Sequence, residues 1–490
     1  MSISRHTTYN MLGALAPLVV TLLTVPLYLE VVGVERYGAL TLCWIVIGYF
    51  GFLDLGLGPA VAQRTAASLR GGEAGEQGAI FTTATLLSVA MGITAGILFY
   101  AASLLYPEFA SERSELTGEF LEATPLLALL VPLVMMNSVA TGMLQGQERF
   151  LTLNVIVAIS STLMSALPLL FAWLTVPNLF TLVAGALAAR VVGCLLAFAA
   201  ARGSLGRGGL GGFRAGLVVP LLKFGGWVTV TTAAAPLLLT IDRLALGALL
   251  GAAAVAAYAI AYSLVSRLSM VPTSLATALF PRFAGSQAEE RDRLVSVSVP
   301  AIAVIMTPAV VAGLVATRPF FELWIGQELA AICAPVAYIL FLGVWVNSFG
   351  QIPFALLQGS GRPDIVSKLH LAELAPYWAV LFAGIWAFGL PGAAAAWALR
   401  MAADTLLLYL LAGTGMARLR QLVPPALLVV ASFLAAALAP AGWREALGAG
   451  LLVAAMIWAW HAMPPFLKQQ LAALAARVRG RGAPASEASR

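Results

Sequence analysis

The sequence has few charged residues: Asp, Glu, Lys and Arg make up only 10% of its 490 residues, whereas 61% are hydrophobic. A soluble domain carries roughly 25% charged residues, so this composition excludes an ordinary soluble protein. The mean hydropathy is +0.93, and apolar runs of about 20 residues, long enough to cross a bilayer, recur along the chain. We therefore expect an all-α polytopic membrane protein.

Cysteine and histidine are also scarce, with three of each. Cys43, Cys194 and Cys333 lie in apolar runs at spacings that match neither a metal site nor a disulfide framework, so we expect them to pack in the interior. The histidines are scattered, no acid cluster has metal-ligand spacing, and no glycine-rich phosphate loop follows a strand. We predict that the protein is not an enzyme and has no cofactor or metal.

Fourteen apolar segments are long enough to be predicted as membrane spans. They lie at about 10–32, 38–61, 78–106, 122–146, 150–174, 179–201, 220–248, 251–279, 294–317, 329–357, 365–388, 391–413, 423–441 and 444–463.

The basic residues are unevenly distributed between the two predicted sides of the membrane. With a cytoplasmic N-terminus, the outer side receives only Arg36, Arg113, Arg318 and Arg444, and most other loop and tail bases fall on the inner side. The positive-inside rule then places both termini in the cytoplasm. This bias accounts for the net charge of +6 without a nucleic-acid partner, and we expect none.

Two parts of the chain are similar to each other. Asn137–Ser138 and Leu144–Gly146 are matched, about 213 residues later in the Leu-Gln-Gly motif, by Asn347–Ser348 and Leu357–Gly359. A chance similarity between helices rich in small residues is the alternative. An offset of six spans keeps one orientation, so we predict two pseudo-symmetric six-helix bundles followed by two more helices. The predicted parts are a bundle over 1–205, a linker over 206–219, a bundle over 220–415, a helix pair over 416–463 and a basic tail over 464–490.

Two like-oriented bundles are typical of carriers. Such bundles can rock about a site near the middle of the membrane, which gives alternating access. The connections between the predicted spans are too short to hold a folded domain outside the membrane. We therefore expect the activity to reside within the membrane.

Several ionisable residues lie inside the predicted spans. Each costs about 2.5 to 3.5 kcal/mol on insertion scales, so each is expected to be paired, hydrated or functional. Snorkelling near a span end or structural pairing is the alternative at every position. The candidates are Asp54, Arg190, Asp242, Arg243, Arg267, Glu373, Arg400 and Asp404.

Their spacing predicts some partners. Arg400 and Asp404 are four residues apart on one predicted helix and can form an ion pair. Asp242 and Arg243 are adjacent and therefore point about 100° apart, so they need other partners or a hydrated cavity. Arg267 lies in the polar, break-prone segment Tyr262–Pro272, which suits a water-lined face.

The residue types indicate two kinds of role. The forked guanidinium of arginine fits phosphate or pyrophosphate, so Arg243, Arg267 and Arg400 are candidates for binding an anionic headgroup. The carboxylates are candidates for ion coupling, with H+ or Na+ left open, or for gating; they are Asp54, Asp242, Asp404 and Glu373. For Asp54, a structural and a functional role are equally favoured.

The N-terminal part resembles a known family. Tyr37-Gly38 followed by GYFGFLDLGLG over Gly48–Gly58 is similar to the N-terminal signature of bacterial oligosaccharide flippases in the multidrug/oligosaccharidyl-lipid/polysaccharide exporter superfamily. The Leu-Gln-Gly motifs and the fourteen-span layout extend this similarity over most of the chain. The matched signature positions are Tyr37, Gly38, Asp54, Gly56 and Gly58, and their role in the family can be structural.

This resemblance implies a flippase that moves an undecaprenyl-pyrophosphate-linked oligosaccharide from the cytoplasmic to the periplasmic leaflet of the bacterial inner membrane. It implies a central cationic cavity and a product used for O-antigen, capsule or exopolysaccharide assembly. The expected partners are the lipid-linked oligosaccharide and membrane lipids, with a polysaccharide polymerase and chain-length machinery also considered.

Three other functions remain open from the sequence. A cation-coupled multidrug exporter has the same fold, and a peptidoglycan-precursor flippase is closer still. A membrane glycan polymerase, ligase or acyltransferase is disfavoured because the sequence shows neither a long external loop nor a reactive constellation of acids or histidines.

Overall fold

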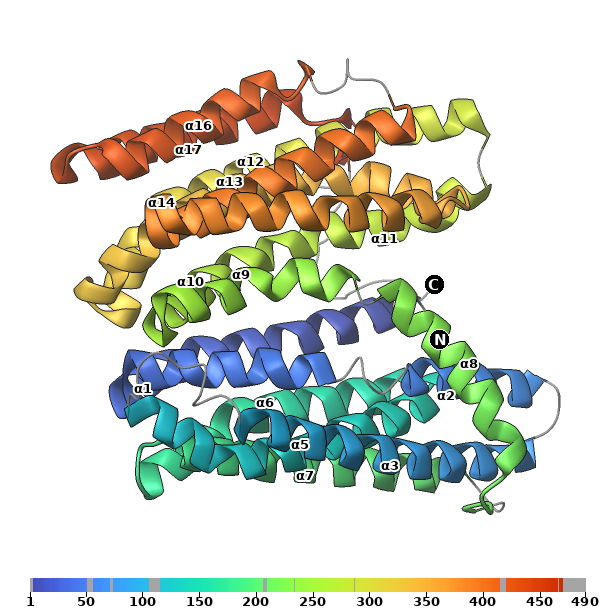
Figure 1. The fold of residues 1–490 in the computed structure, drawn as a ribbon. Coiled ribbons are helices and arrows are strands. Elements are labelled where there is room, and N and C mark those ends of the chain that lie inside the picture. The colour runs from blue at the N-terminus through green and yellow to red at the C-terminus, as the bar shows by residue number, and fades with distance from the viewer. Residues whose placement is uncertain are drawn as a thin grey trace, which may run out of the picture. The chain divides into compact units, whose positions relative to one another are not determined.

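The computed structural model describes residues 3–50, 56–70, 74–104, 115–205, 209–232, 234–285, 287–414, 420–465 and 467–469. Helices account for nearly all of these residues, and the described ranges contain no strand (Figure 1). The prediction of an all-α membrane protein is confirmed. Two compact units divide the chain, Met1–Ala259 and Ile260–Arg490.

Unit 1 consists of α1, which is broken at Gly33, and of the helices that pack on α1 and on one another. Its α3 packs on α5, α5 on α7, and α7 on α6, while α1 lies against α6. The element bounds are α1 Ile3–Phe50, α2 Leu57–Arg70, η1 Ala74–Glu76, α3 Gln77–Leu104, α5 Glu115–Gly146, α6 Phe150–Leu174, α7 Leu179–Ser204, α8 Ala215–Thr232 and α9 Ala234–Leu250. The division between the units falls within α10, Ala252–Val265.

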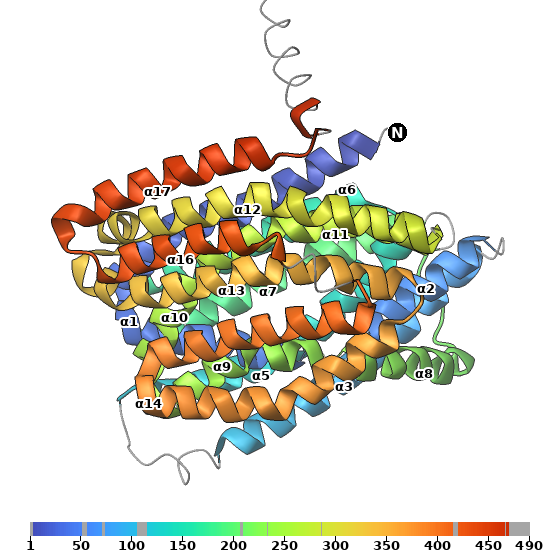
Figure 2. The same ribbon diagram turned by 90° about the horizontal axis from the view of Figure 1, so that it is seen from above.

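In unit 2, α12, α13 and α14 pack side by side, and α16 and α17 pack on α12 (Figures 1 and 2). The elements are η3 Ser266–Ser269, α11 Met270–Gly285, α12 Ala288–Ile325, α13 Gln327–Gly359, α14 Pro363–Ala412, α16 Val423–Leu438 and α17 Ala441–Ala462. The core of this unit lies along α13, whose buried face includes Cys333, Phe341 and Phe349.

Two glycines break long helices into hairpins. Gly33 has φ 80° within α1, and Gly389 has φ 61° within α14. Glycine has no Cβ and adopts positive φ without strain, which explains its presence at these breaks. Each helix therefore contains two limbs that run in opposite directions, as the sequence predicted around residues 33–37 and 389–390.

The predicted spans agree with the observed helices. Ten helices in the described residues are long and apolar enough to cross a membrane, and α16 is a shorter apolar helix. Counting both limbs of α1 and α14, and α8 with α9 as one span, brings the total to about fourteen. The predicted 38–61 span includes residues 51–55, which lie outside the described residues. The predicted domain boundaries stay a prediction.

The signature glycines of unit 1 lie where backbones approach closely. A Cβ on Gly38 would clash with the backbone of Ala252, and one on Gly58 would clash with Ser138 of α5. Gly56 has φ +65°, and a Cβ there would clash with the backbone of Gly225. These contacts indicate that the glycines of the signature are needed for helix packing.

Other details also match the sequence analysis. Cys43, Cys194 and Cys333 are buried free thiols, as expected for packing residues. The predicted break near Arg267 is present as the 3₁₀ turn η3 between α10 and α11.

Candidate functional site

Four titratable side chains meet between the two limbs of α14. His370 and Glu373 lie on the limb before Gly389, and Arg400 and Asp404 lie on the limb after it. We call these four residues the α14 cluster. His370 and Glu373 are three residues apart and therefore share one face of the first limb, and Arg400 and Asp404 are four apart and share one face of the second.

Arg400 and Glu373 form the central ion pair of the α14 cluster. The Nε atom of Arg400 donates to Oε2 of Glu373 at 3.3 Å, and both side chains are only 8% exposed. The Arg400 guanidinium also lies 5.4 Å from the ring centroid of Tyr377, at cation–π distance. Burial of the two charges costs desolvation free energy, and removal of either partner would leave the other charge buried and unpaired.

His370 and Asp404 form the second pair of the cluster. Nε2 of His370 is 3.4 Å from Oδ1 of Asp404, and the two side chains are 20% and 8% exposed. The predicted pairing of Arg400 with Asp404 is wrong: the guanidinium reaches across the hairpin to Glu373 instead. The imidazole adds a positive charge only when it is protonated.

Polar atoms of the central pair remain available. Nη1 of Arg400 and Oε1 of Glu373 are buried, and neither has a hydrogen-bond partner among the described residues. A cavity of about 280 Å³ adjoins the pair. Its lining is otherwise largely apolar and consists of Leu369, Ala372, Glu373, Pro376, Tyr377, Val380, Ala396, Leu399, Arg400, Ala403 and Leu407.

The cluster lies deep within the two limbs. Glu373 is ten residues from the start of α14, and Arg400 is eleven residues from Gly389, which correspond to about 15 to 17 Å along a helix. The hydrocarbon core of a bilayer is about 30 Å thick, so both residues lie near its middle. Because a charge at this depth is costly, its presence indicates a candidate functional site.

The other predicted site residues do not join this cluster. Asp54 lies outside the described residues. Asp242, on α9 in unit 1, is fully buried with Tyr258 and Arg243 as its electrostatic partners, and the backbone N–H of Arg243 donates to Oδ1 of Asp242 at 2.8 Å. Arg267 is half-buried on η3 in unit 2.

Two features of the structure were not predicted from the sequence: the part of His370 in the α14 cluster, and an ion pair in unit 1 between Arg36 and Glu119. Glu119 accepts from Nε of Arg36 at 2.9 Å and from the backbone N–H of Leu179 at 2.8 Å. This arrangement joins the turn of α1 to the first turns of α5 and α7. The position of His370 three residues before Glu373 was the available signal for the α14 cluster, although pairing across the hairpin is visible only in the structure.

The fold and the buried charges define a polytopic membrane protein of the transporter type. Residues 3–287 match the family described as "Polysaccharide biosynthesis protein", and residues 228–374 match the MatE family. The first match covers more than half of the chain, so the chain belongs to the polysaccharide biosynthesis protein family.

A curated relative extends this assignment over most of the sequence. The Shigella flexneri protein named "Putative O-antigen transporter" is 28% identical over 413 residues, which cover 83% of this chain and 97% of the relative.

Solved structures confirm the fold. An inward-facing multidrug resistance MATE family transporter of the MOP superfamily matches with a TM-score of 0.68 and 18% identity, covering 82% of this chain and 96% of its own. The lipid II flippase MurJ, in an inward closed conformation, matches with a TM-score of 0.68 and 12% identity, covering 91% and 98%. These relatives and fold neighbours are transporters or flippases, which supports the prediction that the chain is not an enzyme.

Proposed function

We propose that the protein flips an undecaprenyl-pyrophosphate-linked oligosaccharide from the cytoplasmic to the periplasmic leaflet of the inner membrane for surface polysaccharide assembly. The observation that carries this proposal is the match to the Shigella flexneri relative, because it spans 83% of this chain and 97% of the relative. Transport proceeds by alternating access, and both termini lie in the cytoplasm. A polysaccharide polymerase and chain-length machinery are the proposed protein partners.

The fold alone does not separate this function from its nearest alternatives. The MATE transporter and MurJ match with the same TM-score, so a cation-coupled drug exporter and a peptidoglycan-precursor flippase have equal structural support. Membership of the polysaccharide biosynthesis protein family, with a relative named as an O-antigen transporter, favours an oligosaccharide cargo.

The deep charges divide into two proposed roles. Arg243 and Arg267 bind the pyrophosphate, because a guanidinium donates two parallel hydrogen bonds to phosphate oxygens. Glu373 and Asp404 bind the coupling ion. The pairing of Arg400 with Glu373 favours a place for Arg400 in the coupling cluster over its predicted role as a pyrophosphate ligand.

A deletion strain tests the proposed function in cells. We expect loss of surface polysaccharide together with accumulation of the complete lipid-linked repeat unit on the cytoplasmic leaflet, both reversed by the wild-type gene. Arg243→Ala and Arg267→Ala, at wild-type membrane levels, should fail to reverse them, whereas the exposed Arg202→Ala should succeed. A normal surface polysaccharide in the deletion strain contradicts the proposal.

A further inference from the structure

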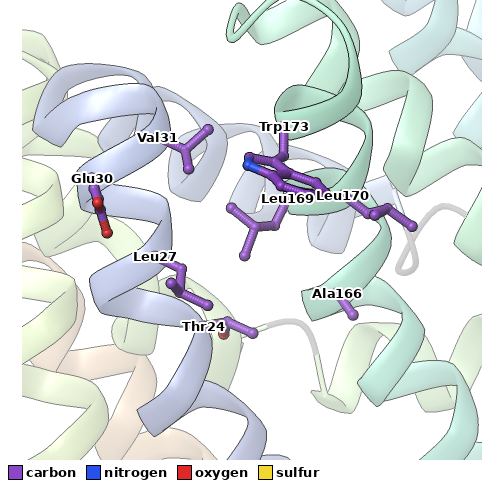
Figure 3. A pocket seen from close by; sticks show the side chains of 8 residues that line it. All are labelled: Thr24, Leu27, Glu30, Val31, Ala166, Leu169, Leu170 and Trp173. Carbon is purple, nitrogen blue, oxygen red and sulfur yellow. The ribbon is translucent and has the colours of Figure 1, made fainter.

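A groove runs between the first limb of α1 and α6 in unit 1 (Figure 3). Its volume is about 520 Å³, and it is lined by Thr24, Leu27, Glu30, Val31, Ala166, Leu169, Leu170 and Trp173. None of the roles proposed above uses these residues. Glu30 is the one charged side chain in this lining.

The groove has the depth of one bilayer leaflet. Thr24 lies nine residues before Gly33, where the first limb ends, and Ala166 lies eight residues before Leu174, the last residue of α6. These separations correspond to about 12 to 14 Å along a helix. Half of a hydrocarbon core of about 30 Å is about 15 Å, so the groove extends from the membrane surface to near the middle.

Polarity changes along the groove in the same direction. Trp173 is 70% exposed and lies one residue from the end of α6, at the level where tryptophan belts contact headgroups. Its ring extends across Leu169 toward α1 (Figure 3). Leu27, Leu169 and Leu170 continue the apolar lining beneath it. This order of a polar end followed by apolar side chains is the order of groups in a phospholipid.

Glu30 supplies the charge that the headgroup must complement. It lies on α1 at the rim, on the side away from α6 (Figure 3), and it is exposed. The carboxylate forms no ion pair or hydrogen bond with any of the described residues. Arg36, six residues further along α1, pairs with Glu119 and Glu115 instead.

We propose that this groove is a binding site for a phospholipid with a primary ammonium headgroup, the phosphatidylethanolamine class. The ammonium group pairs with the Glu30 carboxylate, and one acyl chain lies along Leu27, Leu169 and Leu170 beneath the Trp173 ring. An anionic headgroup is repelled by the carboxylate, and a choline headgroup cannot donate hydrogen bonds to it. Neither of the proposed cargo-binding arginines lines this groove, and the proposed lipid site does not depend on the cargo.

Native mass spectrometry of the full-length, delipidated protein tests this site. The probes are dioleoyl phosphatidylethanolamine, phosphatidylcholine and phosphatidylglycerol, each titrated separately. We expect tighter binding of phosphatidylethanolamine by about two- to fivefold, the range that a partly exposed ion pair gives. Glu30→Gln should remove this preference and leave phosphatidylcholine binding unchanged. The control Glu35→Gln, at an exposed residue outside the groove, should keep it.

A second pair of variants tests the place of the acyl chain. Leu27→Trp fills the groove and should weaken binding of all three lipids, whereas Leu23→Trp, on the same exposed limb but outside the lining, should not. Thermal unfolding verifies that each variant is folded. A headgroup preference that survives Glu30→Gln, tighter binding of phosphatidylglycerol, or equal effects of the two tryptophan variants overturns the proposal.

Discussion

Arg400 and Glu373 form an ion pair across the hairpin of α14, with 3.3 Å between Nε and Oε2 and with both side chains almost fully buried. They are 27 residues apart in the sequence. The pair therefore connects the two limbs on either side of Gly389. A change in its charge alters the contact between two spans, which makes the cluster suited to couple ion binding to helix movement.

Removal of one partner of this pair should destabilise unit 2. Glu373→Ala leaves the Arg400 charge buried without its carboxylate, at an expected cost of about 3 to 5 kcal/mol. The double variant Glu373→Leu/Arg400→Met should recover most of this loss, because it replaces the pair with apolar side chains. Thermal unfolding in detergent measures both changes.

The exposed pair of Lys368 and Asp364 on the same helix is the matched control. Its Nζ and Oδ2 atoms are 3.2 Å apart, and the side chains are 78% and 55% exposed. Lys368→Ala should cost no more than about 1 kcal/mol. Equal losses for Lys368→Ala and Glu373→Ala would contradict the importance assigned to burial of the central pair.

His370 should influence coupling more than stability. His370→Gln keeps a polar side chain beside Asp404 but removes the imidazole, which can accept and donate a proton. We expect the variant to move cargo down a concentration gradient at the wild-type rate while losing acceleration by an imposed pH gradient. His461→Gln, at an exposed histidine of α17, is the control. Unchanged acceleration in His370→Gln would exclude this residue from coupling.

Glu119 should stabilise unit 1 through its contacts with Arg36 and Leu179. Glu119→Ala leaves the Leu179 N–H without its acceptor and leaves the Arg36 guanidinium with only the exposed Glu115 carboxylate, and we expect a loss of about 2 to 4 kcal/mol. Glu115→Ala removes a carboxylate that is 85% exposed and only 3.3 Å from the same guanidinium, and it should cost about 1 kcal/mol or less. Unfolding temperatures that fall equally would refute this distinction.

Two glycines of the signature region should respond to alanine substitution in opposite directions, one losing and one gaining stability. Gly38→Ala places a Cβ against the backbone of Ala252 and should lower the yield of folded protein. Gly48→Ala, ten residues along the same limb, places a Cβ in open space and should stabilise the helix by up to about 1 kcal/mol. Fluorescence-detected size-exclusion chromatography at increasing temperature compares them, and a folded, stable Gly38→Ala protein would contradict the packing role.

The sequence predicted the helical architecture because long apolar runs have few alternatives in a membrane. Even the hairpin turn before Pro391 was placed correctly, since the apolar segments on either side were too long for a single span. The bounds of α6 and α7 agree closely with the predicted 150–174 and 179–201 segments.

Partners of the deep charges were harder to predict. Spacing on a single helix favoured Arg400 with Asp404, but the second limb faces the first, and Glu373 is the carboxylate that the guanidinium reaches. Contacts between neighbouring spans depend on helix rotation, which sequence periodicity does not define when nearly every face is apolar. Three residues of the α14 cluster, Glu373, Arg400 and Asp404, could therefore be identified as candidates from the sequence. Their partners could not be predicted.

The most direct test of the proposed function is transport by the purified full-length protein in liposomes. A fluorescent undecaprenyl-pyrophosphate oligosaccharide is incorporated, and a membrane-impermeant reagent reports the fraction in each leaflet over time. The proposed function predicts transbilayer movement well above the rate in protein-free liposomes, reduced by Arg243→Ala and Arg267→Ala and retained by Arg202→Ala. Movement at the protein-free rate, or transport of drug cations alone, would contradict it.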